Sequence, residues 1–83
     1  MSKRKFKFDE NKRDVPGGKT NGQRAEQAEY ATAAANRTRG ESDRLDEDAV
    51  RDLLADLGHL CDREGYDYKS LLDLAWDDWR AER

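Results

Sequence analysis

The sequence has little of what a membrane protein or a disulfide-stabilised secreted protein needs. Apolar residues make up only 35% of its 83 residues, and no run approaches the roughly 18 consecutive apolar residues of a membrane span. Its single cysteine, Cys61, excludes an internal disulfide. The basic N-terminus is not followed by the apolar stretch of a signal peptide. These absences predict a protein of the reducing cytoplasm that has no contact with membranes.

Residues that carry catalytic chemistry are also scarce. His59, the only histidine, is predicted to face solvent, whereas Cys61 lies on the apolar stripe of the same helix as a small buried filler. The two side chains point to different sides, so they cannot form a nucleophile–base pair. Carboxylates near His59 are scattered over a convex surface and do not converge as metal ligands. We therefore expect no enzyme, no metal and no cofactor.

Charge is what the sequence has in abundance, and it is unevenly distributed. Charged residues make up 42% of the chain. Residues 1–24 carry eight basic and three acidic residues, a net charge of +5, whereas the remainder carries eight basic and sixteen acidic residues, a net charge of −8. A basic segment therefore precedes an acidic body.

Residues 1–22 are predicted to form a flexible basic arm, because this polar segment offers too little apolar surface to offset the entropy of ordering it. Three roles stay open for the arm. It is a solubilising tail, a protein-docking arm, or a nucleic-acid contact in which basic side chains follow phosphates while aromatic rings stack on bases. The residues that would make this contact are Lys3, Arg4, Lys5, Phe6, Lys7 and Phe8.

Residues 23–83 are predicted to form a small all-α domain. An alanine-rich helix over 23–38 follows the capping-box pair Thr20 and Gln23. A strongly amphipathic helix over 46–64 has apolar residues at three- and four-residue spacing. Its start is marked by an N-cap aspartate, Asp46, and its end by Gly65.

A third helix is predicted over 68–82, with Asp67 as its N-cap and a stripe of Tyr, Leu and Trp residues along one side. Only a short turn separates it from the second helix. We therefore expect the two helices to pack as an antiparallel hairpin, stripe against stripe, with the alanine-rich helix packed on them. The predicted fold is a small helical hairpin or three-helix domain with a disordered basic N-terminal arm.

The apolar arc of the third helix covers roughly 200°, wider than one hairpin partner needs, because Leu74 and Trp76 fall on either side of the stripe. Either the first helix covers this excess or Trp76 is an exposed anchor for a partner. The many carboxylates nearby either form an ordinary solvated surface or attract a positively charged groove. The candidate partner-binding residues are Asp52, Asp56, Asp73, Trp76, Asp77 and Trp79.

Residues 52–68, which read DLLADLGHLCDREGYDY, continue into a last helix that ends in aromatic residues. This part of the chain resembles a family of small uncharacterised proteins carried by bacteriophages and plasmids, whose tail reads roughly DLLxDLMHW before a Gly and an Asp–aromatic pair. Gly58 and Leu60 stand here where Met and Trp are common in that family. The basic arm is not a feature of the family.

The resemblance implies an origin in a mobile element, whose small proteins often bind and block a host machine. Inhibitors of CRISPR–Cas complexes are one such class. We therefore expect a non-enzymatic inhibitor or modulator of a host protein or nucleoprotein complex, acting in the host cytoplasm. The alternative is a small nucleic-acid-binding accessory protein that uses the arm. The oligomeric state is expected to be a monomer or a weak homodimer through the exposed apolar flank.

Overall fold

The computed structural model describes residues 8–42 and 44–83. It contains three helices, α1 (Asn21–Thr38), α2 (Glu47–Glu64) and α3 (Tyr68–Glu82). No strand occurs in the part of the chain that is described, and the nearest approach to one is an isolated bridge between Arg13 and Thr20. The all-α, three-helix class is confirmed. Residues 1–7, the first third of the predicted arm, lie outside the described residues, and with them five of the six residues of the predicted nucleic-acid contact.

Local capping explains where the helices begin and end. The Thr20 hydroxyl accepts a hydrogen bond from the Gln23 backbone N–H, and the Gln23 side-chain oxygen accepts one from the Thr20 backbone N–H. The predicted capping box is therefore present. Asp46 and Asp67 cap α2 and α3 as predicted. Gly65 ends α2 with a φ of 78°, a conformation that glycine adopts without strain. Helix α1 begins two residues earlier than predicted, immediately after its cap.

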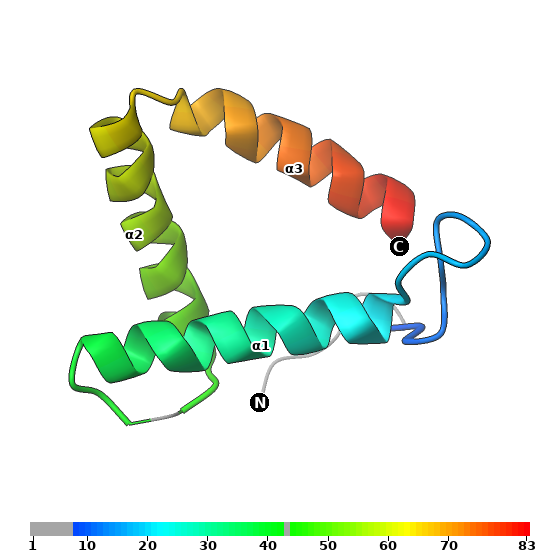
Figure 1. The fold of residues 1–83 in the computed structure, drawn as a ribbon, viewed down its shortest axis with the longest axis horizontal. Coiled ribbons are helices and arrows are strands. Elements are labelled where there is room, and N and C mark those ends of the chain that lie inside the picture. The colour runs from blue at the N-terminus through cyan, green and yellow to red at the C-terminus, as the bar shows by residue number, and fades with distance from the viewer. Residues whose placement is uncertain (1–7, 43) are drawn as a thin grey trace.

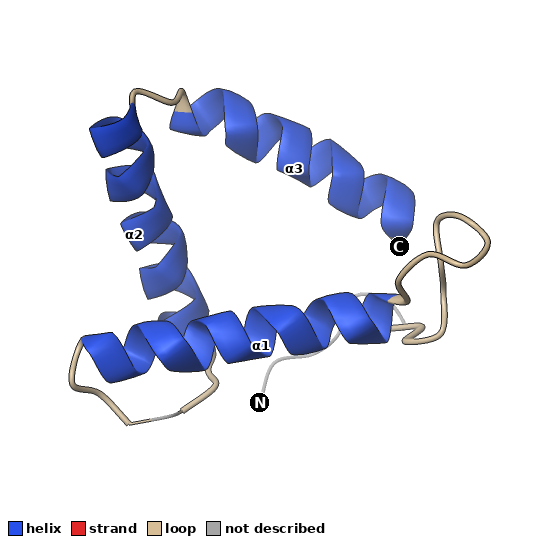
Figure 2. Cartoon of the chain, in the orientation of Figure 1, coloured by secondary structure: helices blue, strands red, loops and turns tan. Residues whose placement is uncertain are grey.

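The three helices form the three sides of a triangle and meet in pairs at its corners (Figure 1). From the end of α2, α3 returns to the start of α1. The Cα radius of gyration is 14.3 Å, whereas a compact chain of this length has about 12 Å. The predicted antiparallel packing of the last two helices is wrong, because α2 and α3 diverge from the turn between them (Figure 2).

Little apolar surface is buried in this open arrangement. Among the described residues only Thr32, Asn36, Ala49 and Cys61 are buried. Four large side chains of the α2 stripe remain 40–44% exposed, although side chains of this type are usually buried in a core; they are Val50, Leu54, Leu57 and Leu60. The corners, rather than a continuous core, therefore hold the helices in place.

The α1–α2 corner is built around Asn36, whose side chain is fully buried. Its Nδ2 donates to the Arg44 carbonyl at 2.8 Å, and its Oδ1 accepts from Arg39 at 2.7 Å. Arg39 also reaches across to α2, where its guanidinium lies 2.6 Å from the Asp56 carboxylate. Asn36 thus folds the α1–α2 loop back onto α1 and orients the arginine that ties the two helices together.

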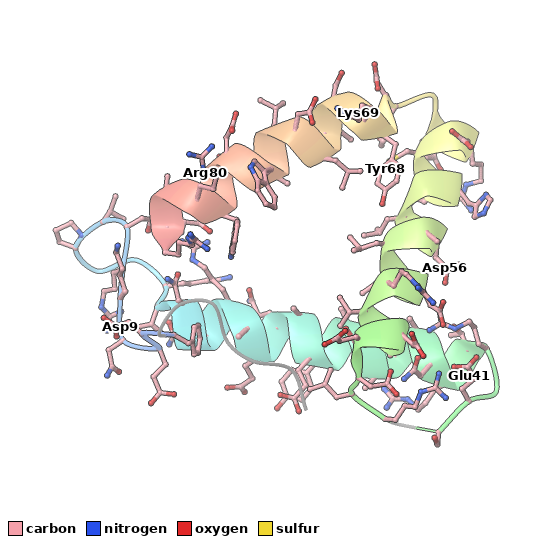
Figure 3. The ribbon with its side chains drawn as sticks, turned by 180° about the vertical axis from the view of Figure 1, so that it is seen from behind. Asp9, Glu41, Asp56, Tyr68, Lys69 and Arg80 are labelled. Atoms are coloured by element: carbon pink, nitrogen blue, oxygen red, sulfur yellow. The ribbon has the colours of Figure 1, made fainter. Side chains whose placement is uncertain are left out.

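The α2–α3 corner depends on Tyr68, the first residue of α3, which points toward α2 (Figure 3). Its hydroxyl donates to the Leu54 carbonyl. Its ring lies over Gly58, where an added Cβ would sit only 2.8 Å from a ring carbon. Gly58 is therefore a notch in α2 that accommodates the Tyr68 ring.

This notch predicts a sign reversal in a double-mutant cycle. In the native protein Gly58→Ala should lower the free energy of unfolding by about 1 kcal/mol, because displacing the Tyr68 ring costs more than the gain in helix propensity. In a Tyr68→Ala background the same change should instead stabilise by about 1 kcal/mol, the propensity gain alone. Urea unfolding followed by circular dichroism measures both. Stabilisation of similar size in both backgrounds would show that the ring does not occupy the notch.

The α3–α1 corner joins the two ends of the domain through polar contacts. The Asn21 side chain donates to the Glu82 carbonyl at 2.9 Å, and Lys12 Nζ donates to the Arg83 carbonyl at 2.6 Å. Arg24 lies between two carboxylates, 3.3 Å from Glu82 and 3.2 Å from Asp14. These contacts close the triangle.

The segment before α1 is more ordered than predicted. The N–H groups of Asn21 and Gly22 donate to the carbonyls of Lys12 and Glu10 at 2.9 and 2.8 Å. An added Cβ on Gly22 would lie 2.9 Å from the Glu10 carbonyl oxygen, so glycine permits this close approach. The expectation of an unstructured segment over 1–22 is therefore too broad, since hydrogen bonds link residues within 9–18 to one another and to the start of α1.

Candidate partner-binding surface

Helix α3 is exposed along almost its whole length. All of residues 69–81 are exposed, and only Tyr68 and Glu82, at its two ends, are partly buried. Both of these end residues belong to corners of the triangle. Helix α3 is therefore held at its ends, and the residues between them are accessible to other molecules.

Two faces of α3 differ in chemistry. Tyr68 and Trp79 lie on the side that meets α2 and α1, and at 100° per residue Leu71, Leu72 and Ala75 fall on the same side. We call these five residues the inner face of α3. The opposite face is charged, and Arg80 points away from the triangle (Figure 3). The helix is thus amphipathic, but its apolar side is not covered along its length.

Trp76 lies at the edge between these two faces and is 58% exposed. Asp73 and Asp77 are its neighbours on the helix surface, and the three residues are called the Trp76 patch below. The indole lies 5.0 Å from that of Trp79, centroid to centroid, with an interplanar angle of 47°. Asp73 accepts from Lys69 Nζ at 2.9 Å with both carboxylate oxygens. The patch offers a large aromatic ring beside carboxylates on a convex surface.

The structure does not bring all six predicted partner-binding residues together. Asp73, Trp76 and Asp77 share one patch, and Trp79 adjoins it from the inner face. Asp56 is engaged by Arg39 at the α1–α2 corner, and Asp52 is half-buried on α2. The best-defined candidate surface is therefore the Trp76 patch on α3 alone.

A pocket of about 460 Å³ at the α3–α1 corner was missed by the sequence prediction, because three distant segments form it. Phe8 and Trp79 supply aromatic walls. The Arg83 guanidinium lies 4.4 Å above the Trp79 ring centroid, a cation–π contact. Arg24 and Glu82 of the lining form an ion pair and Lys12 donates to the Arg83 carbonyl, so the lining shows the contacts of a structural corner.

Three of the four described basic residues within 8–24 also take part in contacts within the chain. Lys12 donates to the Arg83 carbonyl, Arg13 to the Gly18 carbonyl at 2.7 Å, and Arg24 pairs with carboxylates. Phe8 is 42% exposed and is the one member of the predicted arm contact that the structure describes. The nucleic-acid hypothesis therefore depends on residues 3–7, which lie outside the described residues.

The titratable side chains singled out from the sequence lie where they were predicted. His59 is exposed, and Cys61 is buried at 8% exposure. Within residues 8–42 and 44–83, no three His, Cys, Asp or Glu residues gather closely enough to hold a metal ion. The same residues include no helix with the length and apolar character needed to cross a membrane.

Asp67 shows the clearest electrostatic effect. Its pKa is lowered chiefly by the hydrogen bond that its carboxylate accepts from the Ser70 backbone N–H at the start of α3. A lowered pKa in the folded state means that the carboxylate contributes stability above its unfolded pKa, and that this contribution is lost as the pH falls through the folded pKa.

We therefore expect acidification to destabilise the Asp67→Asn variant less than it destabilises the native protein. Asparagine also caps helices but does not titrate, so the variant should show a smaller loss of stability between neutral and acidic pH than the native protein. Thermal unfolding at a series of pH values measures this difference. Parallel pH profiles for the two proteins would contradict the assignment.

No protein family, curated protein or solved structure significantly matches the chain.

Proposed function

We propose that this chain is a non-enzymatic binding protein that inhibits or modulates a host protein or nucleoprotein complex. The observation that carries the proposal is the exposure of α3 between its two anchored ends, with Trp76 58% exposed. The resemblance to small phage and plasmid proteins supports a mobile-element origin and a host target of the kind that CRISPR–Cas inhibitors block.

Energetics support a partner for α3. Fully burying a large apolar side chain is worth about 1.5–3 kcal/mol, and Trp76 retains more than half of its surface in water. A partner with a pocket for the indole would recover that free energy. Tryptophan is also one of the residues most enriched at the energetic centres of protein interfaces.

Charge defines the partner's chemistry. Residues 46–83 hold twelve acidic and five basic residues, a net charge of −7. A surface of this sign attracts a basic groove, such as those of proteins that hold nucleic acid, and speeds association with it. The target surface is therefore proposed to be basic, with an apolar pocket at its centre.

Capture from host lysate, with and without nuclease, tests the proposal. A tagged chain should retain one host protein or complex after nuclease treatment, identified by mass spectrometry. Asp73→Asn/Asp77→Asn should reduce the capture. The matched control is Glu26→Gln/Glu29→Gln, which removes two exposed carboxylates from α1 instead. Equal capture by the native protein and both variants would overturn the assignment of the surface.

The basic N-terminus favours a second candidate function, nucleic-acid binding, because residues 1–24 carry a net charge of +5. Deleting residues 1–7 separates the two candidates. Nucleic-acid binding through the arm predicts that nuclease treatment abolishes capture and that the deletion does so as well. Docking through α3 predicts that capture survives both treatments.

A further inference from the structure

The apolar sides of α2 and α3 face each other across the triangle but do not meet. Tyr68 contacts α2 at Leu54 and Gly58, so that side of α2 looks toward α3. Val50, Leu54 and Leu57 lie on this side by helical spacing and are 40–44% exposed. On the inner face of α3, Leu71 and Leu72 are 45% and 37% exposed. Val50, Leu54 and Leu57 are called the inner face of α2, and together with the inner face of α3 they are the inner faces considered below.

The exposed area is large enough to form a dimer interface. The chain exposes 7003 Å², whereas a compact monomer of its mass exposes about 5,100 Å². If residues 1–7 are given the full area of an unfolded chain, about 1,300 Å², and the rest of the chain is compared with a compact monomer of its own mass, about 4,700 Å², roughly 950 Å² of excess remains. One partner in a standard protein interface buries about 800 Å².

We propose that a second copy of this chain covers these inner faces. The two copies pack the apolar sides of α2 and α3 against each other around a two-fold axis, so that each contact is made twice. Aliphatic side chains from both copies then form the core that a single copy lacks.

The placement of charge fits a second copy. Asp73 and Asp77 lie on the side of α3 opposite its inner face, so pairing the inner faces buries apolar residues and leaves these carboxylates in water. The basic first part of one copy, at +5 for residues 1–24, also complements the −7 of residues 46–83 in the other.

The stability of the helices is a second argument that another copy of the chain covers the inner faces. Helices α2 and α3 have 18 and 15 residues, and in proteins most of the stability of such helices comes from tertiary packing of their amphipathic face. The inner faces therefore need a cover whenever the chain is folded, including before it meets a target. A second copy is present wherever the chain is made.

This inference goes beyond the proposed function and leaves the Trp76 patch available. The patch lies outside the inner face of α3, with Trp76 at its edge and Asp73 and Asp77 on the opposite side, so a dimer would present two copies of it to a target. Failure of target capture with an intact dimer would count against the proposed function alone.

Sedimentation equilibrium and thermal unfolding of the native protein test the proposal. The mass should rise from the 9.6 kDa of one chain toward twice that value as the concentration increases over about 1–100 μM. The midpoint temperature should rise with concentration, because dimers are stabilised by mass action. A mass of 9.6 kDa with a constant midpoint over the whole range would overturn the proposal.

Two matched leucine variants locate the interface. Leu72→Lys places a charge on the inner face and should weaken dimerisation at least about tenfold, whereas Leu74→Lys, on the other side of α3 and 61% exposed, should leave it unchanged. Equal dissociation constants for both variants would contradict the inner-face interface. If Leu72→Lys does not fold, nuclear Overhauser contacts between labelled and unlabelled native chains decide, and their absence among Leu54, Leu57 and Leu72 would overturn it.

Discussion

Asn36→Ala should lower the free energy of unfolding by about 3 kcal/mol, because alanine leaves buried polar groups without their partners. The amide is fully buried and bonds both the Arg44 carbonyl and the Arg39 guanidinium. Arg39 in turn holds Asp56 at 2.6 Å, so loss of the amide frees the arginine that ties α1 to α2. A small domain has only about 3–5 kcal/mol of stability from its core, so the variant should keep no more than about 2 kcal/mol.

Urea unfolding measures this effect, with Thr38→Ala as the matched control. Thr38 lies in the same last turn of α1 and also makes a hydrogen bond, from its hydroxyl to the Ala35 carbonyl at 2.7 Å, but it is exposed. Its replacement should change stability by no more than about 0.5 kcal/mol. An Asn36→Ala effect as small as that of the control would show that the corner does not hold the helices together.

Trp76→Ala should weaken binding to the captured target about 30-fold, which corresponds to about 2 kcal/mol. Within the chain the indole contacts Trp79 but remains 58% exposed, so its removal should affect stability far less than binding. The loss of affinity should appear mainly as faster dissociation, since truncating a buried anchor acts on the bound state.

Leu74→Ala is the matched control for this loss of affinity. Leu74 is as exposed as Trp76, at 61%, and belongs to the same helix, but it lies on the other side of α3. Surface plasmon resonance of the two variants against the captured target should separate them by at least about tenfold. Similar affinities for both would indicate that general exposure of α3, rather than the Trp76 patch, determines binding.

Helix boundaries were predictable because the residues that set them are neighbours in the sequence. Thr20 with Gln23, Asp46, and the pair Gly65 and Asp67 each act on backbone groups within a few residues. Amphipathic spacing likewise identified the stripes on the last two helices. The three-helix content of the fold could therefore be read from the sequence.

The arrangement of the helices was not predictable in the same way. It depends on pairs far apart in the sequence, such as Asn21 with Glu82 and Arg39 with Asp56, and periodicity carries no information about them. The short turn before α3 suggested a close hairpin, but the anchoring of Tyr68 on Gly58 and of Glu82 on α1 directs α3 across the triangle instead.

The candidate site was predictable only where its residues are neighbours on one helix. Asp73, Trp76 and Asp77 share one helix surface, which the helical repeat alone places together. Asp52 and Asp56 were grouped with them by charge, but the corner contact of Asp56 with Arg39 separates that carboxylate from the patch. The pocket beside Trp79 had no sequence signal, since its walls come from three segments.

The central claim is that α3 binds the target through the Trp76 patch. Hydroxyl-radical footprinting of the captured complex is the most direct test of it. Trp76 should be oxidised readily in the free protein, as its 58% exposure requires, and be protected several-fold in the complex. Tyr30, 67% exposed on α1, should be oxidised equally in both states. Unchanged oxidation of Trp76 in the complex, with protection elsewhere on the chain, would contradict the account.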